Sequence, residues 1–139
     1  MNDQKKIAAL WYEAFETKNS DILDRILAKD WVDIPPAPNQ PAGPAGAKQI
    51  LVELGTTFPD LRIKIEDMIQ EGNKVVVRST ISGTHEGELM GTPATGRQVA
   101  FSCLTISRCS AGKIEEEWEL PDTVSLLRQV GVLPDMAEA

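Results

Sequence analysis

The sequence contains few of the residues from which metal sites and covalent active sites are commonly built. Its 139 residues include one histidine and two cysteines. Cys103 and Cys109 fall in one predicted strand, where six residues of extended chain separate their Cα atoms by roughly 20 Å, beyond disulfide reach. We therefore expect reduced cysteines and no zinc site of the usual ligand types. The chain also lacks a glycine-rich phosphate loop and a recognisable serine or cysteine nucleophile, which disfavours nucleotide-dependent and covalent mechanisms.

Positive charge and long apolar runs are also scarce. The chain has fourteen lysines and arginines and twenty-one acidic residues, for a net charge of −7. This excess of negative charge repels phosphate backbones and anionic lipids. No apolar run approaches the length that spans a bilayer, and residues 1–6 do not resemble a signal peptide. We expect a soluble, cytoplasmic protein with neither a nucleic-acid nor a membrane partner.

The length and composition indicate one globular domain covering residues 1–139, since hydrophobic residues make up 42% of the chain. Apolar residues at helical spacing predict a first helix near residues 3–15, a shorter one from Asp21 and a third over residues 47–58. The segment 35–46 has five prolines and two glycines, which predicts an ordered surface loop that acts as a rim or lid.

From Leu61 onward the apolar period changes from helical to two, which predicts strands. Four are expected, over residues 61–70, 75–85, 97–108 and 114–120, followed by a short helix that opens at Pro121 and Asp122. Helices that are segregated from a run of antiparallel strands are typical of an α+β domain. We expect a curved antiparallel sheet, covered by helices, with a cavity between the two layers.

Many short motifs, in order and over most of the chain, resemble those of the SnoaL-like polyketide cyclases. They are Gly43-Pro44-Ala45-Gly46-Ala47-Lys48, Phe58-Pro59-Asp60-Leu61, Glu71-Gly72-Asn73-Lys74-Val75, Gly83-Thr84-His85-Glu86-Gly87, Gly91-Thr92-Pro93-Ala94-Thr95-Gly96, Gly112-Lys113-Ile114, Glu116-Glu117-Trp118, Asp122 and Gln129-Val130-Gly131. The resemblance implies the cone-shaped fold of the nuclear-transport-factor-2-like superfamily. It also implies a homo-oligomer, dimer or tetramer, formed through the sheet.

In characterised members of that family the reaction is a cofactor-free intramolecular aldol ring closure. The resemblance therefore implies an enzyme that acts on a small apolar carbonyl compound without a cofactor. Two alternatives stay open, because folds do not fix functions. One is a domain that only binds a hydrophobic ligand, and the other is isomerase, hydratase or epoxide-hydrolase chemistry like that of superfamily relatives such as ketosteroid isomerase.

An aldol closure needs a base beside a carbonyl compound and donors that hold the developing oxyanion. Asp122 matches the acid/base aspartate of the family and is the candidate base, although an aspartate after proline at a helix start is also a common N-cap. His85 matches a pocket histidine and is the candidate hydrogen-bond donor. Its alternative role is to hold the neighbouring loop as a partly exposed residue at the end of a strand.

Four further residues are candidates for the pocket wall. Simple alternation places Ile114, Glu116, Trp118, Leu120 and, past Pro121, Asp122 on one side of the strand, taken as the concave side. Glu116 and Trp118 would then face the substrate, with Trp11 and Phe101 as further substrate-binding candidates, although aromatic residues at these spacings are more often core residues, Trp11 above all. The sequence departs from the family where Glu117 stands at a position that is often histidine, and where Ala94 follows Pro93.

Overall fold

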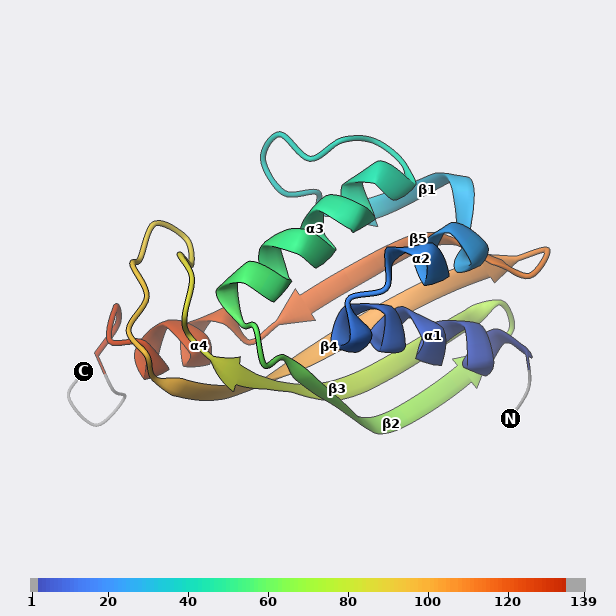
Figure 1. Cartoon of the computed structure of the whole chain (residues 1–139). Helices are drawn as coiled ribbons and strands as arrows, with labels where there is room; N and C mark the ends of the chain where they lie inside the picture. Colours follow the sequence, from blue (N-terminus) through green and yellow to red (C-terminus); the bar gives the residue numbers. More distant parts are fainter. Residues whose placement is uncertain (1–2, 135–139) are drawn as a thin grey trace.

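A computed structural model describes residues 3–134 as one five-stranded sheet with four helices (Figure 1). In chain order the elements are α1 (Asp3–Thr17), α2 (Ser20–Ile26), β1 (Leu27–Ile34), α3 (Pro44–Thr57), β2 (Arg62–Glu71), β3 (Lys74–Thr84), β4 (Gln98–Ser110), β5 (Lys113–Pro121) and α4 (Thr123–Gln129). The α+β class predicted from the sequence is confirmed. None of the helices within residues 3–134 has the length and apolar character needed to cross a membrane.

The sheet has the strand order β1-β5-β4-β3-β2, and only the β1/β5 pair is parallel. The prediction of four strands was wrong because β1 was missed. It follows α2 without an intervening turn and precedes the proline-rich loop, so only a short extended stretch was visible in the sequence. Over the described residues the sheet keeps two separate edge strands, β1 and β2, and is therefore curved but not closed into a barrel.

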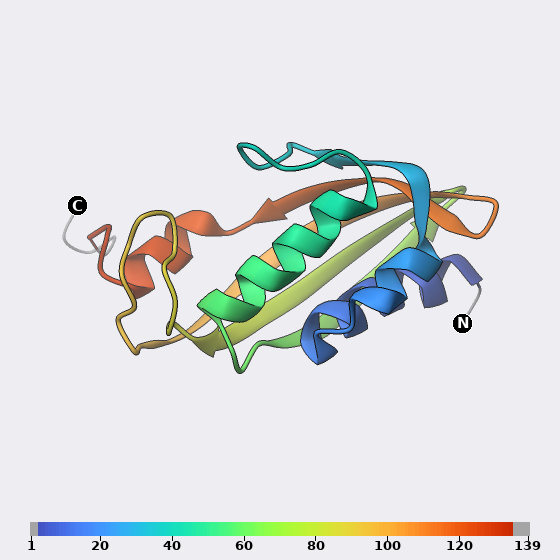
Figure 2. The same ribbon diagram turned by 45° about the horizontal axis from the view of Figure 1, so that its top comes forward.

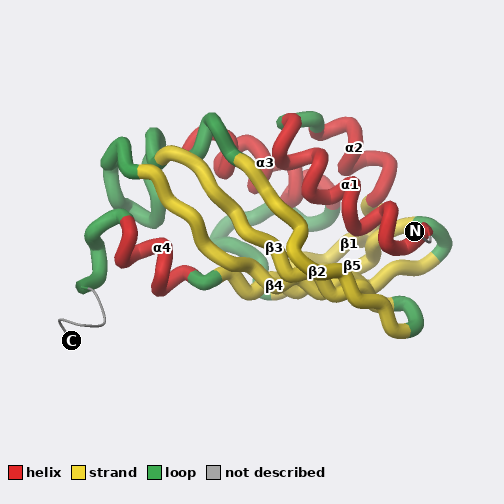
Figure 3. The backbone as a smooth tube through the Cα atoms, turned by 90° about the horizontal axis from the view of Figure 1, so that it is seen from below, coloured by secondary structure: helices red, strands yellow, loops and turns green. Residues whose placement is uncertain are grey.

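Helices α1, α2 and α3 all cover one face of this sheet, as Figures 1 and 2 show, and we call it the covered face. The core lies between these helices and the sheet. Its side chains with 2% exposure or less include Ala14, Leu23, Trp31, Val75, Val77 and Ile114. The view from below shows the other face, the open face, with no helix across it among the described residues (Figure 3).

The loops and the last helix fix the ends of the sheet. Helix α3 begins at Pro44, three residues before the predicted start, because proline is favoured in the first helical turn. The helix α4 is attached to β4 through Gln129, whose amide group donates to the Ala100 carbonyl oxygen (2.7 Å) and accepts from the Ala100 N–H (2.9 Å). The Gln129 side chain supplies the two hydrogen bonds that a neighbouring strand would make to Ala100, because the pairing of β5 with β4 does not extend that far.

The two cysteines lie on β4, and both are buried free thiols. Their placement on one strand is as predicted. Burial raises the pKa of Cys103 to about 11, so its thiol stays protonated at neutral pH.

Candidate functional site

A β-bulge in β5 decides which side chains reach the interior of the protein. Arg108 of β4 pairs with Glu116, whereas the next residue, Cys109, pairs with Ile114. The extra residue, Glu115, is therefore unpaired and reverses the alternation beyond it. Ile114 and Glu117 are both fully buried on the covered face although they are three positions apart, a spacing that regular alternation would place on opposite faces.

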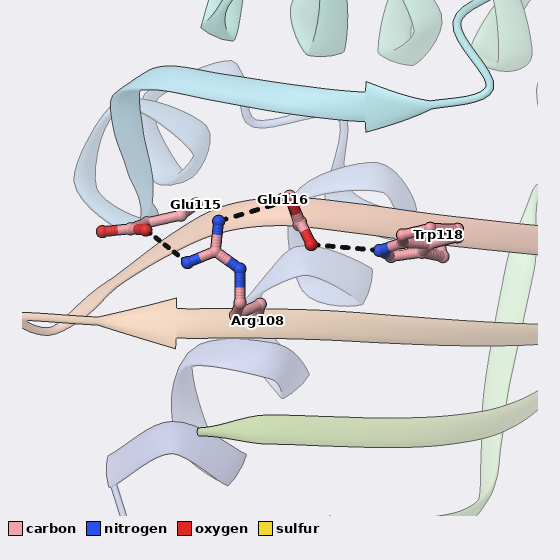
Figure 4. Close-up of polar contacts among 4 residues, drawn as sticks. All are labelled: Arg108, Glu115, Glu116 and Trp118. Carbon is pink, nitrogen blue, oxygen red and sulfur yellow. Dashed lines mark hydrogen bonds and ion pairs between the residues drawn. The ribbon is translucent and has the colours of Figure 1, made fainter. Parts of the chain in front are cut away.

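The predicted orientation of Glu116 and Trp118 was wrong for this reason. Both point to the open face, where Trp118 is 48% exposed. Figure 4 shows Arg108 holding the bulge there: its guanidinium binds Glu115 (2.6 Å) and Glu116 (3.3 Å), and the Trp118 indole N–H donates to Glu116 (3.2 Å). The hydrogen bond from Arg108 lowers the pKa of Glu116, so this carboxylate stays ionised.

Three carboxyl groups lie on the covered face in place of the predicted ones. Register places Asp33 of β1 beside Glu117 of β5, and Glu119 is the next residue of β5 on the same face. We call Asp33, Glu117 and Glu119 the interior acids. Asp33 is 9% exposed and Glu117 is 0% exposed, with neither carboxyl oxygen of Glu117 hydrogen-bonded.

The interior acids hold protons more tightly than free carboxyl groups do. Burial, followed by the nearby charges of Glu119 and Asp33, raises the pKa of Glu117 well above its ordinary value. Burial, followed by the charge of Asp33, raises the pKa of Glu119 to about 7. Burial also raises the pKa of Asp33, against a hydrogen bond from the Gln40 amide (3.1 Å) that lowers it. A carboxyl group with a pKa of about 7, such as that of Glu119, can exchange protons near neutral pH.

Hydroxyl groups surround the interior acids. On β4, Ser107 pairs with Glu117 and Thr105 pairs with Glu119, so these side chains share the covered face. Tyr12 of α1 descends onto them, and its buried hydroxyl has no hydrogen-bond partner. The site therefore combines proton acceptors and donors within a water-poor layer.

Two surface hollows reach the interior acids at the end of β1. A hollow of ≈ 250 Å³ beneath the 36–43 loop is lined by Asp33 and Trp31. A second hollow of ≈ 390 Å³ has a mainly apolar wall that includes Leu104 and Trp118, with Glu119 in its lining. Pro36 lines the first hollow and Ile34 and Pro35 line the second, so the two hollows lie at the same short segment.

Asp122 lies outside this interior. Its side chain is exposed and accepts a hydrogen bond from the Ser125 N–H (3.1 Å), which makes it the N-cap of α4. The expectation that it points inward was wrong, because the chain leaves the sheet after Pro121. It lines a shallow hollow of ≈ 300 Å³ with Arg78 and Ser102 among its neighbours. A role for Asp122 as a base stays a prediction.

His85 is fully buried, so the alternative of a partly exposed histidine was wrong. Its ring Nδ1 accepts the Thr95 backbone N–H (3.3 Å) and contacts the Thr95 hydroxyl (2.9 Å). A neutral ring therefore carries its hydrogen on Nε2, which is buried without a partner. His85 closes the 85–97 loop, and its role as a substrate donor stays a prediction.

The structure does not bring the predicted catalytic residues to one place. Ser107, the partner of Glu117, pairs with Val75, ten residues before His85 along β3. At about 3.3 Å per residue this separation is on the order of 30 Å. By the same measure, Asp122, whose N–H bonds to Ser102 opposite Thr80, is roughly 16 Å from His85 along the strands.

The two aromatic candidates are buried on the covered face. Trp11 is 5% exposed and packs on Phe15 and Trp31, with ring centroids 4.8 and 5.8 Å apart. Phe101 is 7% exposed and packs on Phe58, which also contacts the His85 ring. Both belong to the core, and substrate contact by either stays a prediction.

Among residues 3–134 no three histidine, cysteine, aspartate or glutamate side chains form a group suited to a metal ion. The candidate residues that sequence reasoning did not select are Tyr12, Asp33, Glu117 and Glu119. One signal was available in the sequence, because Glu117 stands at a position that is often histidine in the family. Simple alternation hid its significance, because the bulge that turns Glu117 inward has no distinct sequence motif.

The protein is thus a small α+β domain whose sheet is covered by helices. Between the two layers it carries buried carboxyl and hydroxyl groups of the kinds that can transfer protons. Residues 5–130 match the sequence profile of the SnoaL-like polyketide cyclases. The chain belongs to this family.

Characterised relatives and solved structures agree with this assignment. The chain is 30% identical over 122 residues to the nogalonic acid methyl ester cyclase of Streptomyces nogalater, covering 85% of this chain and 90% of the relative. It is 26% identical over 135 residues to the aklanonic acid methyl ester cyclase DauD of Streptomyces sp. (strain C5), covering 94% and 83%. The structure of TsrD from Streptomyces laurentii superposes with a TM-score of 0.88 at 27% identity, covering 94% and 96%.

Proposed function

We propose that this protein catalyses cofactor-independent ring closure of a small, largely apolar carbonyl compound through the interior acids. The observation that carries the proposal is Glu117, a fully buried carboxyl group without a hydrogen-bond partner, between Asp33 and Glu119. A purely structural role would leave this group paired. Membership of a family whose relatives are named as methyl ester cyclases supports the same chemistry.

Glu119 is the proposed base, because it is partly accessible and its pKa of about 7 suits proton transfer at neutral pH. Its carboxylate removes a proton from a carbon next to a substrate carbonyl group, and an enolate forms. The enolate carbon attacks a second carbonyl carbon of the same molecule and forms the new carbon–carbon bond. The resulting alkoxide takes the proton back from Glu119, so no atom is gained or lost.

The hollow that Glu119 lines supports an apolar substrate. Its wall is built from Ile34, Pro35, Leu104, Ile106, Trp118 and Leu120. Trp118 thereby keeps its proposed role in substrate binding, through the hollow on the open face and not through the covered interior. A flat aromatic or polycyclic ligand would lie against its exposed ring.

Turnover assays on matched variants test the proposal. Aklanonic acid methyl ester and nogalonic acid methyl ester, named for the relatives, serve as probes, and chromatography separates each from its cyclised isomer. Glu119→Gln should lower kcat on the order of 10²–10⁴-fold, and Asp122→Asn should keep most of the activity. Glu16→Gln, an exposed site on α1, is the control.

Two results would contradict the proposal. Loss of turnover in Asp122→Asn with full activity in Glu119→Gln would move the base to Asp122. Tight binding of both probes, with no conversion by the wild-type protein, would indicate a domain that only binds its ligand.

We also propose that a second copy of the chain covers the open face, as a homodimer. Side chains there are apolar and exposed: Leu104 (44%), Ile106 (37%), Trp118 (48%) and Leu120 (72%). Burial of such a patch stabilises association, and it would also shield the hollow next to Glu119 from water. Leu120→Arg should convert a dimer to a monomer in sedimentation velocity. A wild-type monomer at all concentrations would contradict the proposal.

A further inference from the structure

The hydroxyl group of Tyr12 is a buried donor without an acceptor. Tyr12 lies on the inner side of α1 with 6% exposure, and no hydrogen bond reaches its oxygen. The phenol lies over the acidic side of the sheet, close to the Thr105 hydroxyl and to the carboxyl groups of Glu117 and Glu119, and its contact with Thr105 falls outside ordinary hydrogen-bond geometry. Because tyrosine hydroxyls usually find a partner when buried, this group points to an absent ligand.

Glu117 is the second unpartnered group at the same place, and sheet register fixes its position independently. Its neighbours across the sheet are Asp33 on one side and Ser107 on the other. Both of its oxygens are buried, and their contacts with Ser107 and Glu119 fall outside ordinary hydrogen-bond geometry. A carboxylate in this position would need cationic or N–H partners, whereas a carboxylic acid needs only an acceptor for its proton.

We propose that Tyr12 and a Glu117 that keeps its proton are two donors that bind one substrate oxygen, while Glu119 moves the proton. This inference rests on the proposed function and assigns further residues to the same reaction. The oxygen is the carbonyl oxygen that gains negative charge when the adjacent carbon loses its proton. Donors already in place for that charge lower the barrier most, because they need not reorganise.

The surroundings favour a protonated Glu117. The titratable groups that act on it and on its neighbours are all acids: Tyr12 from α1, Asp33 from β1, Cys103 and Cys109 from β4, and Glu119 from β5. Burial is the largest cause that raises the pKa of each of these groups, Glu117 included. When Glu119 is ionised, its charge holds the proton on Glu117 still more firmly.

Substitutions can distinguish whether Glu117 acts as a hydrogen-bond donor or as a base. Glu117→Gln retains an N–H donor and should lower kcat only roughly tenfold, since a neutral amide is a weaker donor. Glu117→Met and Tyr12→Phe remove a donor, and each should lower kcat on the order of 10²–10³-fold with a small change in KM. If Glu117→Gln loses as much activity as Glu119→Gln, Glu117 is a base and the inference is overturned. Unchanged kcat in Tyr12→Phe also overturns it.

Infrared spectroscopy supplies a readout that does not depend on turnover. At neutral pH the wild-type protein should show the carbonyl stretch of a buried carboxylic acid, which Glu117→Gln removes and Glu119→Gln retains. Glu16→Gln should leave the band unchanged, and circular dichroism checks that each variant is folded. Absence of the band overturns the inference even where turnover assays support the proposed function. Presence of the band without any turnover supports the protonation state but rejects the proposed reaction.

Discussion

The pKa of the interior acids predicts that the protein loses stability as pH rises from 4.5 to 7. The pKa of Glu119 rises from an ordinary 4.5 to about 7 on folding, so in this window the folded state binds more protons than the unfolded chain. Stability therefore falls by up to about 1.4 kcal/mol per pH unit, or about 3 kcal/mol in total for this group. A domain of this size typically has only about 5–15 kcal/mol of stability, so the effect is measurable.

Urea unfolding, followed by tryptophan fluorescence at pH 4.5, 5.5, 6.5 and 7.5, measures this dependence. Glu119→Gln should lose about 3 kcal/mol less than the wild type across the series. The lowered pKa values of Asp60 and Glu116 act in the opposite sense, because their contributions are present above their ordinary pKa and lost in acid. Both groups remain in the variant and cancel in the comparison. If the free energy of unfolding changed with pH by the same amount in the wild type and in Glu119→Gln, the assignment of a buried proton to these acids would be refuted.

Two further changes test the packing and the helix cap. Leu23→Ala, in the fully buried centre of α2, should cost roughly 2–5 kcal/mol in urea unfolding because it leaves a cavity; a loss below that range would mean that the site collapses around the smaller side chain. Asp122→Ala removes the N-cap of α4 and should cost about 1 kcal/mol, while Asp122→Asn keeps a capping oxygen and should cost less. Equal losses of stability in Asp122→Ala and Asp122→Asn would show that the charge of the carboxylate, and not its capping hydrogen bond, stabilises α4.

The main architecture could be predicted from the sequence because its periodicity is strong. In β4 every second residue from Val99 to Cys109 is buried, as strict alternation requires. Helix α3 and the proline-rich loop were equally clear, since proline and glycine limit where a helix can start. β1 was missed because it follows α2 without a turn and because its partner strand, β5, comes much later in the sequence.

The candidate site was predicted less well, and one residue explains most of the difference. Glu115 adds a single position to β5, and a one-residue shift exchanges the two faces of a strand. The pairs Glu116/Trp118 and Glu117/Glu119 thus exchanged sides. The local sequence carries little information on such a shift. The bulge depends on the pairing of β5 with β4 and on the ion pairs that Arg108 of β4 makes with Glu115 and Glu116 of β5.

The burial of Asp122 was also mispredicted, for a related reason. The family motif identifies the residue but not the direction of its side chain. At the junction of β5 and α4 the backbone turns, and the carboxylate caps the helix instead of entering the interior. In contrast, the face of His85 was predicted correctly, because β3 pairs with β4 without a bulge up to Thr84 and the His85 N–H continues the ladder by donating to the Arg97 carbonyl oxygen.

The most direct test of the central claim is a crystal structure of the Glu119→Gln variant with aklanonic acid methyl ester bound, since loss of the base should leave the substrate unreacted. The account predicts a substrate carbonyl oxygen within hydrogen-bond distance of both the Tyr12 hydroxyl and the Glu117 carboxyl group, with the carbon that loses its proton next to Glu119. A substrate bound instead in the hollow beside Asp122, with the interior acids still covered, would contradict it.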